Sequence, residues 1–184
     1  LDATPFSTIT YTITQGNDAG RFAVDAVTGV VTMVDSLDRE RAGEAAYTLT
    51  IAATDGGARV ATTTLAIEVM DVNDNAPVFT NPSYEADVIE NSNVGTVGFV
   101  LLTTDADKAE NQVVQFAIVS GNVGGAFAID ADSGEITVAG AIDRETISSY
   151  TLTISATDQA VANVAKWPRL AREQTITITN LDLN

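Results

Sequence analysis

Strict alternation of apolar and polar residues runs through several short stretches of the chain. Residues 8–14 read TITYTIT, and a period of two places Ile9, Tyr11 and Ile13 on one face of a strand, with threonines on the other. The stretches YTLTI (47–51) and TITIT (175–179) alternate in the same way. Turn-forming residues such as DAVTG separate these segments, and no convincing helical period appears beyond a possible turn at each DRE. The pattern predicts an all-β protein.

The chain contains one domain sequence twice. Residues 22–40, FAVDAVTGVVTMVDSLDRE, match residues 127–145, FAIDADSGEITVAGAIDRE, at an offset of 105. The offset falls to 103 for YTLTIAATD (47–55) and YTLTISATD (150–158), and it rises to 111 where Asp71 matches Asp182. Because such self-similarity marks repeated structural units, we expect two domains, at residues 1–75 and 76–184.

Each copy is expected to be a β-sandwich built from short strands. The second copy supplies seven candidate strands, near residues 84–89, 96–103, 113–119, 127–129, 135–138, 150–156 and 175–180. Short strands with frequent turns favour an antiparallel sandwich. Leu1 aligns with Ala106, so the first copy lacks the counterpart of residues 81–105, which carries its first two strands. Such a unit would expose core and a sheet edge, because the chain starts late in a longer array or because another chain supplies the strand.

The charge and composition of the chain restrict its chemistry. With 25 acidic residues, nine Lys and Arg residues and no His, the net charge is −16, which repels nucleic acid and anionic membranes and favours cations. The absence of Cys and His excludes thiol nucleophiles, histidine-based triads and the usual zinc sites. No apolar run reaches the roughly 20 residues that a membrane-spanning helix needs. A hard cation such as Ca²⁺ is the predicted ligand.

The stretch DVNDNAPVF at residues 71–79 carries the most suggestive polar pattern. Its first five residues fit the start of an EF-hand loop, D-x-N-x-N. The loop then departs from that pattern, because Ala76 stands where glycine is needed and Pro82 where glutamate is needed. Any ion bound here must therefore take further oxygen ligands from elsewhere in the chain.

Several motifs together carry a family resemblance. They are LDRE (37–40), ATDGG (53–57), DVNDNAPVF (71–79), TDAD (104–107), IDRE (142–145) and ATD (156–158). In this order and at domain-length spacing, they make the chain resemble tandem cadherin repeats over its whole length. The resemblance implies two Greek-key, Ig-like sandwiches, the first without its N-terminal strands, with calcium at each joint between units and a role in adhesion.

The resemblance also assigns the ligands of a calcium joint between the two copies. Its outermost ion would be held by Asp38, Glu40 and Asp74; its middle ion by Glu40, Asp71, Asp74, Asp107 and the Val72 carbonyl; and its third ion by Asp105, Asp107, Asp158 and Asn73 with the Asn75 and Asn111 carbonyls. A family glutamate from the first strand of the preceding unit is missing in copy one, so the outermost site should be weak or open. Two half-joints are implied as well, one at Asp2 and Asp55, the other at Glu90, Asp143, Glu145, Asp182 and Asn184.

Charge supports a cation at this joint independently of the resemblance. Seven of the assigned side chains are carboxylates, and each close pair would cost on the order of 1 kcal/mol without counter-charge. Calcium accepts six to eight carboxylate, carbonyl and amide oxygens, which is the set found here. We therefore expect calcium to stiffen the joint.

Two further features leave alternatives open. An insertion at residues 159–174 holds Trp167 and Arg169, which could contact a sugar or a partner, or could cover the end of their own sandwich. The triplet DSG (132–134) resembles an aspartic-protease motif but has no acidic match in the other copy, so no enzyme is expected.

The sequence thus favours a calcium-rigidified module of an extracellular or cell-surface adhesion protein, as a segment of a larger chain. Its expected partner is another protein or a glycan on a surface, with a second copy of itself as one candidate. The alternative is a calcium-dependent carbohydrate-binding module. The chain is rich in Thr and Ala and has no Cys, His or N-x-S/T sequon, which favours a bacterial surface protein as its source.

Overall fold

Nearly all regular structure in the chain is β-strand. The computed structural model describes residues 8–159 and 168–182, which fall into two compact units, Leu1–Asp71 (unit 1) and Val72–Asn184 (unit 2). The described helical segments are two short 3-10 turns, η1 (Ala109–Gln112) and η2 (Val123–Gly125). The all-β prediction is therefore confirmed. The division after Asp71 lies slightly earlier than the boundary that the sequence suggested, after residue 75.

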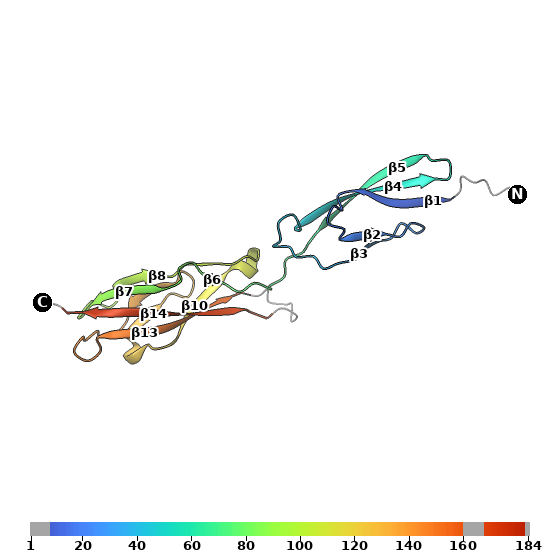
Figure 1. The fold of residues 1–184 in the computed structure, drawn as a ribbon. Coiled ribbons are helices and arrows are strands. Elements are labelled where there is room, and N and C mark those ends of the chain that lie inside the picture. The colour runs from blue at the N-terminus through green and yellow to red at the C-terminus, as the bar shows by residue number, and fades with distance from the viewer. Residues whose placement is uncertain (1–7, 160–167, 183–184) are drawn as a thin grey trace. The chain divides into compact units, whose positions relative to one another are not determined.

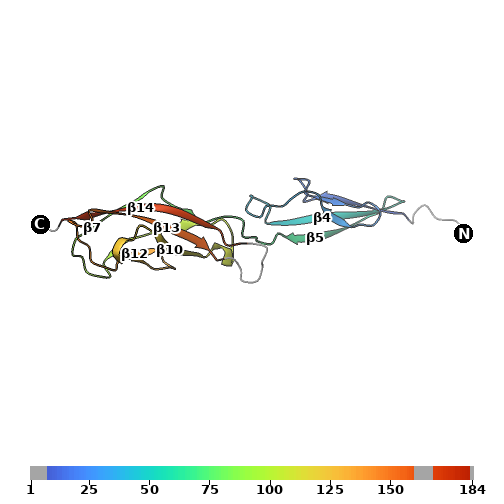
Figure 2. The same cartoon turned by 90° about the horizontal axis from the view of Figure 1, so that it is seen from below.

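Unit 2 is a sandwich of two sheets (Figures 1 and 2). The larger sheet has the order β10-β13-β14-β7 and comprises β10 (Val114–Ser120), β13 (Ser149–Asp158), β14 (Ala171–Leu181) and β7 (Tyr84–Ile89). The smaller sheet has the order β11-β12-β8 and comprises β11 (Phe127–Ile129), β12 (Glu135–Val138) and β8 (Val97–Val100). A short pair, β6 (Val78–Phe79) and β9 (Thr103–Thr104), completes the unit. The first long strand, β7, lies parallel to the last, β14.

The core of unit 2 lies between these sheets and follows directly from alternation. In β13, Tyr150, Leu152 and Ile154 point inward and are 3% exposed or less, while the residues between them face outward. In the antiparallel register with β14, Ile178 lies opposite Tyr150 and Ile176 opposite Leu152, and both isoleucines are also buried. Removing this apolar surface from water drives the two sheets together.

Several predicted strands of unit 2 match the observed ones closely. β7, β11 and β12 have the predicted bounds, while β13 and β14 are longer than expected. The single strand predicted at 96–103 is divided into β8 and β9, and β6 was missed. The division has a clear cause, because Leu101 N donates to Gly134 O whereas Leu102 O accepts from Thr80 N. The chain changes sheets at this point.

Unit 1 contains the counterparts of five of these strands. One sheet has the order β1-β4-β5 and comprises β1 (Ile9–Gln15), β4 (Ala46–Asp55) and β5 (Val60–Glu68). The other is the pair β2 (Phe22–Val24) and β3 (Val31–Met33). By the repeat offsets, these correspond to β10, β13, β14, β11 and β12. Within residues 8–71 no strand corresponds to β7 or β8, so the predicted absence of the first two strands is confirmed.

The missing strands leave apolar residues of unit 1 exposed. Among its described residues, the buried apolar side chains are Phe22, Leu49 and Ala52. Ile9 is 47% exposed and Met33 is 60% exposed, although alternation places Ile9 on the inward face of its strand. The face predicted from the TITYTIT pattern therefore exists but is only partly covered, as expected of a sandwich without its first two strands.

A bulge closed by glycine recurs at the same place in both units. The β1–β4 and β10–β13 registers each shift by one residue near the end of the first strand. Gly16 (φ 80°) and Gly121 (φ 82°) follow these bulges in the left-handed region. A Cβ on Gly121 would lie 1.8 Å from the carbonyl oxygen of Thr151, and one on Gly16 would lie 2.0 Å from that of Thr48. Both positions therefore require glycine for space as well as conformation.

We expect Gly121→Ala to destabilise unit 2 by about 3 kcal/mol or more, because the Thr151 carbonyl would have to move. Gly95→Ala is the matched control: Gly95 has a similar φ of 88° but open space around it, so only the conformational cost of about 1 kcal/mol applies. Urea unfolding of the whole chain, followed by circular dichroism, measures both. Equal losses in the two variants would show that the close approach to Thr151 does not matter.

Candidate metal centres

The N-terminal end of unit 2 places two predicted ligands in direct contact. Asp158, at the end of β13, is fully buried and accepts hydrogen bonds from Leu170 N at 3.0 Å and from Asn73 Nδ2 at 3.0 Å. Asn73 is 3% exposed, and its Nδ2 also donates to Pro168 O at 2.8 Å. The amide nitrogen of Asn73 is thus fully used, which fixes the direction in which its oxygen points.

A second set of predicted ligands lies at the same end of the unit. Asn75 donates to Asp107 through both its backbone N, at 3.2 Å, and its Nδ2, at 2.7 Å. Asp107 is 2% exposed, and its own backbone N donates to Asp105 Oδ1 at 2.9 Å. Asn111, in η1, is also buried, and Val72 O accepts from Asp74 N at 2.9 Å. The carboxylates of Asp107 and Asp158 therefore hold Asn75 and Asn73 in place.

These two sets of residues fit a hard cation. Asn73 Oδ1 is buried, and no hydrogen-bond donor among the described residues reaches it. An unsatisfied buried oxygen costs free energy, and here it stands beside the buried carboxylate of Asp158. Amide oxygens and carboxylates are ligands that calcium accepts in sites of mixed composition. Asn73, Asp158, Asp105 and Asp107 would hold such an ion, which would supply the missing positive charge.

The C-terminal end of unit 2 gathers a separate group of acids. Glu90 follows β7, and Asp143 and Glu145 precede β13; one carboxylate oxygen of each lies within 4.8 Å of those of the other two. Glu90 is 8% exposed and accepts from Arg144 N at 3.4 Å. A backbone hydrogen bond at Glu145 lowers the pKa of its carboxyl, but repulsion from Glu90, together with the contact to Asp143 and burial, outweighs it and raises that pKa. Repulsion within this cluster therefore makes the ionised form of Glu145 less favourable.

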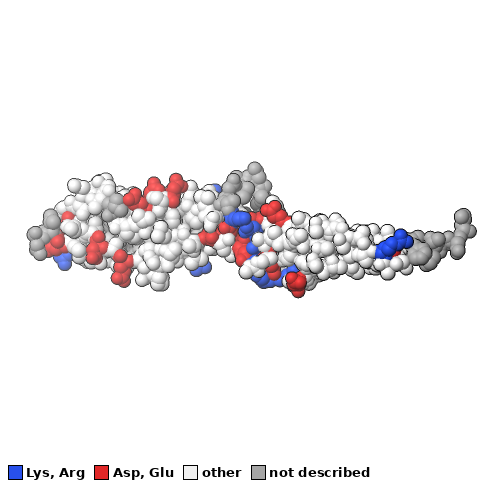
Figure 3. All heavy atoms as spheres, turned by 90° about the horizontal axis from the view of Figure 1, so that it is seen from above, with Lys and Arg blue, Asp and Glu red and all other residues white. Residues whose placement is uncertain are grey.

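The two groups lie at opposite ends of unit 2. Asp143 and Glu145 come just before β13 begins, and Asp158 is its last residue. Ten residues of strand rise about 3.3 Å each, so β13 separates the groups by roughly 30 Å. Figure 3 shows further acidic side chains along this unit and few basic ones. Arg144 Nη1 lies 3.9 Å from Asp182 Oδ2. Asp182, which also belongs to the predicted C-terminal half-joint, therefore lies at the same end of unit 2 as Glu90 and Asp143.

Unit 1 brings its own predicted ligands together at the end where β4 begins and β5 finishes. Arg39 Nη1 lies 3.1 Å from Glu40 Oε1 and 3.1 Å from Asp71 Oδ1, and all three side chains are less than a fifth exposed. Asp38 Oδ1 accepts from the backbone N of Glu40 and of Arg41, each at 3.1 Å, which forms the turn that the DRE motif predicted. The DRE turn is therefore tied to the residue that follows β5.

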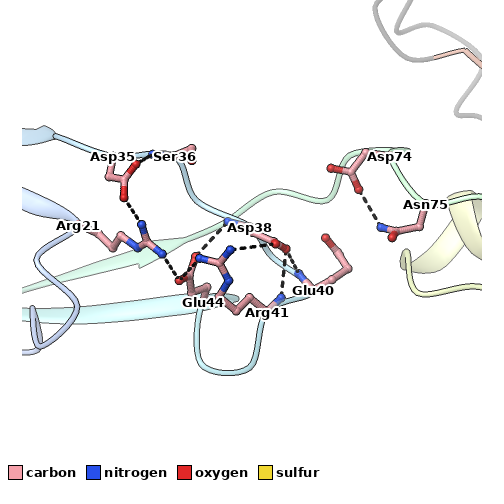
Figure 4. Close-up of polar contacts among 9 residues, drawn as sticks. All are labelled: Arg21, Asp35, Ser36, Asp38, Glu40, Arg41, Glu44, Asp74 and Asn75. Atoms are coloured by element: carbon pink, nitrogen blue, oxygen red, sulfur yellow. Dashed lines mark hydrogen bonds and ion pairs between the residues drawn. The ribbon is translucent and has the colours of Figure 1, made fainter.

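Two residues that the sequence did not single out support this turn (Figure 4). Glu44 accepts from Asp38 N at 3.1 Å and from Arg21 Nη2 at 2.7 Å, and Arg21 also bonds Asp35. The hydrogen bond from Arg21 is the main reason that the pKa of Glu44 is lowered, although burial opposes it. Glu44 thus remains ionised and anchors the backbone of a predicted ligand.

The repeat itself contains the signal that could have identified these two residues. By the offsets of 105 and 103, Arg21 stands where unit 2 has Ala126, and Glu44 where unit 2 has Ile147. Ala126 is buried in the core of unit 2, and Ile147 packs against that core. A change from an apolar pair to an oppositely charged pair, in two otherwise similar copies, indicates contact between the two positions.

The remaining predicted residues lie apart from these groups or outside the described structure. Asp55 is at the other end of β4, where it accepts from Gly57 N and Arg59 N at 2.9 Å and pairs with Arg59. Arg169 is exposed, and its Nη2 donates to Gln159 Oε1 at 3.0 Å. Asp2, Trp167 and Asn184 lie outside the described residues.

Comparison with known proteins identifies the family. The model of the Cadherin domain matches residues 1–70 and 84–179. The chain belongs to the cadherin family. Human Protocadherin Fat 1 is 40% identical over 152 residues, which cover 82% of this chain and 3% of that protein. Mouse Cadherin-23 is 35% identical over 174 residues, which cover 94% of this chain and 5% of that protein. The chain therefore spans a small part of the curated relatives it matches.

Solved cadherin structures show the same fold. Mouse Cadherin-23 EC22-24 matches with a TM-score of 0.86 and 32% identity, over 99% of this chain and 56% of that one. The Protocadherin GammaB4 extracellular domain matches with a TM-score of 0.78 and 27% identity, over 94% of this chain and 27% of that one. The match to these structures confirms the predicted cadherin-type sandwich.

Family membership decides several of the expectations from the sequence. Cadherin domains generally bind calcium, and the relatives of this chain are extracellular cell-surface proteins. Its relatives are adhesion proteins rather than enzymes, and the carbohydrate-binding alternative is not favoured. The relatives named here are animal proteins, so a bacterial source finds no support. Among the described residues, no helix is both long and apolar enough to cross a membrane.

We expect Glu145→Gln to raise the melting temperature of the calcium-free cadherin chain at pH 7. Because the pKa of Glu145 is raised above its usual 4.5, its contribution is most favourable below pH 4.5 and is lost as the pH rises through the raised pKa. A glutamine side chain does not ionise, so the variant would not lose this stability as the pH rises. Glu85→Gln, at an exposed position of β7, is the control for the change in net charge. A melting temperature that does not rise above that of the control would contradict the repulsion.

Proposed function

We propose that this chain is a pair of cadherin modules that calcium stiffens within the extracellular part of a longer cell-surface adhesion protein. The single observation that carries the proposal is the buried Asn73 Oδ1, which lacks a donor among the described residues and stands beside the buried carboxylate of Asp158. Both residues belong to unit 2, and Asn73 lies two residues after Asp71 of unit 1. A cation bound here would be held next to the covalent connection of the two units.

The ligand assignment follows the three-site scheme of the family. The proposed ligands from unit 1 are Asp38, Glu40 and Asp71, and those from unit 2 are Val72, Asn73, Asp74, Asn75, Asp105, Asp107, Asn111 and Asp158. The outermost and middle sites take oxygens from both units, whereas all ligands of the third site belong to unit 2.

Rigidity is the mechanical result of this division of ligands. Without calcium, the carboxylates of the two units repel each other, and the residues that connect the units can bend. Calcium replaces the repulsion with bonds that run from each unit to shared ions. The cluster of Glu90, Asp143 and Glu145 would begin the same kind of joint at the other end of unit 2. A row of such joints makes a stiff rod that presents an adhesive surface at a distance.

The adhesion partner of the whole protein is proposed from the family alone. Cadherins often bind a second copy of themselves, and we propose a protein partner of this kind rather than a glycan. The two units described here would then act mainly as a spacer.

Chelation of calcium should loosen the chain without unfolding it. With excess EGTA, we expect the far-ultraviolet circular dichroism to remain that of a β-protein, because the core of unit 2 contains no metal ligand. Small-angle scattering should show a wider range of angles between the units, and returning calcium should reverse the change. Replacing calcium with magnesium, which prefers a smaller octahedral shell, is the control. Identical scattering with and without calcium would overturn the proposed function.

Asp158→Asn should weaken calcium binding by about tenfold or more, because it removes one of the charges on which affinity depends. Asp132→Asn is the matched control: it changes the same charge in unit 2 at an exposed turn. Calorimetric titration gives both affinities and the number of ions. Equal affinity in both variants would remove Asp158 from the site.

A further inference from the structure

The arginine of the DRE motif in unit 1 bridges two proposed calcium ligands. Its Nη1 lies 3.1 Å from Glu40 Oε1 and 3.1 Å from Asp71 Oδ1. The three side chains are 13%, 17% and 18% exposed, so the bridge is largely shielded from water. Asp71 follows β5, whereas Arg39 and Glu40 precede β4, so this arginine connects two segments that are far apart in the sequence.

The same contact recurs in unit 2. Arg144 and Asp182 are the counterparts of Arg39 and Asp71 at the offsets of 105 and 111. Arg144 Nη1 lies 3.9 Å from Asp182 Oδ2, with side chains 44% and 46% exposed. Two units that differ at many surface positions thus keep an ion pair between the DRE arginine and the linker aspartate. The pair is tighter and less exposed in unit 1.

This position gives the arginine two opposite effects. Its positive charge offsets the repulsion between Glu40 and Asp71 and holds the linker aspartate against the DRE turn. The same guanidinium uses one oxygen of each carboxylate and places a positive charge where a calcium ion would be held. A guanidinium and a calcium ion cannot both take the same oxygens without strong mutual repulsion.

We propose that Arg39 is an internal counter-cation, which holds Asp71 against the DRE turn in the calcium-free protein and gives way to calcium, and so sets calcium affinity. The inference rests on the proposed calcium joint. Arg39 is a positioning residue under this proposal and not a ligand. If it were only a permanent structural tie, its removal would loosen the ligands and weaken calcium binding. The two roles therefore predict opposite changes in affinity.

The test is calorimetric calcium titration of the whole chain and of Arg39→Met, which removes the charge but keeps a long side chain. We expect the dissociation constant of the variant to fall about three- to tenfold, as expected from removing one positive charge a few ångströms from a divalent ion in a hydrated site. We also expect a lower melting temperature of the calcium-free variant. The gain in affinity should shrink in about 1 M salt, where charges are screened within about 3 Å.

Arg59→Met is the matched control. Arg59 also pairs with an aspartate, Asp55, but at the opposite end of unit 1, across the length of β4. Arg59→Met changes the net charge by the same amount as Arg39→Met and should leave the dissociation constant for calcium unchanged. Arg39→Lys, which keeps one charge but loses the planar fork, should bind calcium with an affinity between those of the wild type and Arg39→Met, and it decides the question if the methionine variant does not fold.

The failure of the inference differs from the failure of the proposed function. If the wild-type chain binds calcium and both variants of Arg39 bind it equally well or less well, Arg39 is not a counter-cation, and the calcium joint stands. If the wild-type chain itself gives no calcium heat, the joint is wrong and this inference fails with it.

Discussion

Repulsion between carboxylates, held at fixed positions at the ends of rigid strands, is the constraint on which the rest of this structure depends. Glu90, Asp143 and Glu145 show it most directly, because three acids lie together and the pKa of one is raised. A flexible protein would relieve such repulsion by moving the side chains apart. Here β7 and the strand after Glu145 keep them in place, so positive charge must come from elsewhere, from arginine or from a bound ion.

The rigidity of those strands comes from the alternating pattern itself. Leu152, Ile154 and Ile176 are fully buried between the sheets, so β13 and β14 cannot shift without exposing them. The polar residues at the ends of these strands are therefore held in fixed positions as well. Unit 1 uses a different support, since the Arg21–Glu44 pair stands where unit 2 has two apolar residues, and it anchors Asp38. Similar turns can thus rest on apolar packing in one unit and on charge in the other.

The sequence predicted those features that depend on local pattern and on the repeat. Period-two alternation located β1, β4 and β14, and the offset of 105 revealed two units and the incomplete first one. It did not predict β6 or the break before β9, because a strand that changes partner keeps its alternation while its hydrogen bonds move to another sheet. It also missed Arg21 and Glu44, which are 23 positions apart and meet only after folding. Motifs predicted the position of the acidic residues, whereas the Arg21–Glu44 pair could be found only by comparing the two copies.

The parallel pairing of β7 with β14 has a consequence for a protein under tension. The chain enters unit 2 ahead of Tyr84, and the last described residue follows Leu181. A pull on these two ends draws β7 and β14 in opposite directions along their common axis. The six residue pairs from Tyr84–Ile176 to Ile89–Leu181 would then be loaded together, in shear, rather than opened one after another. A module joined in this way resists stretching best along the axis of these two strands.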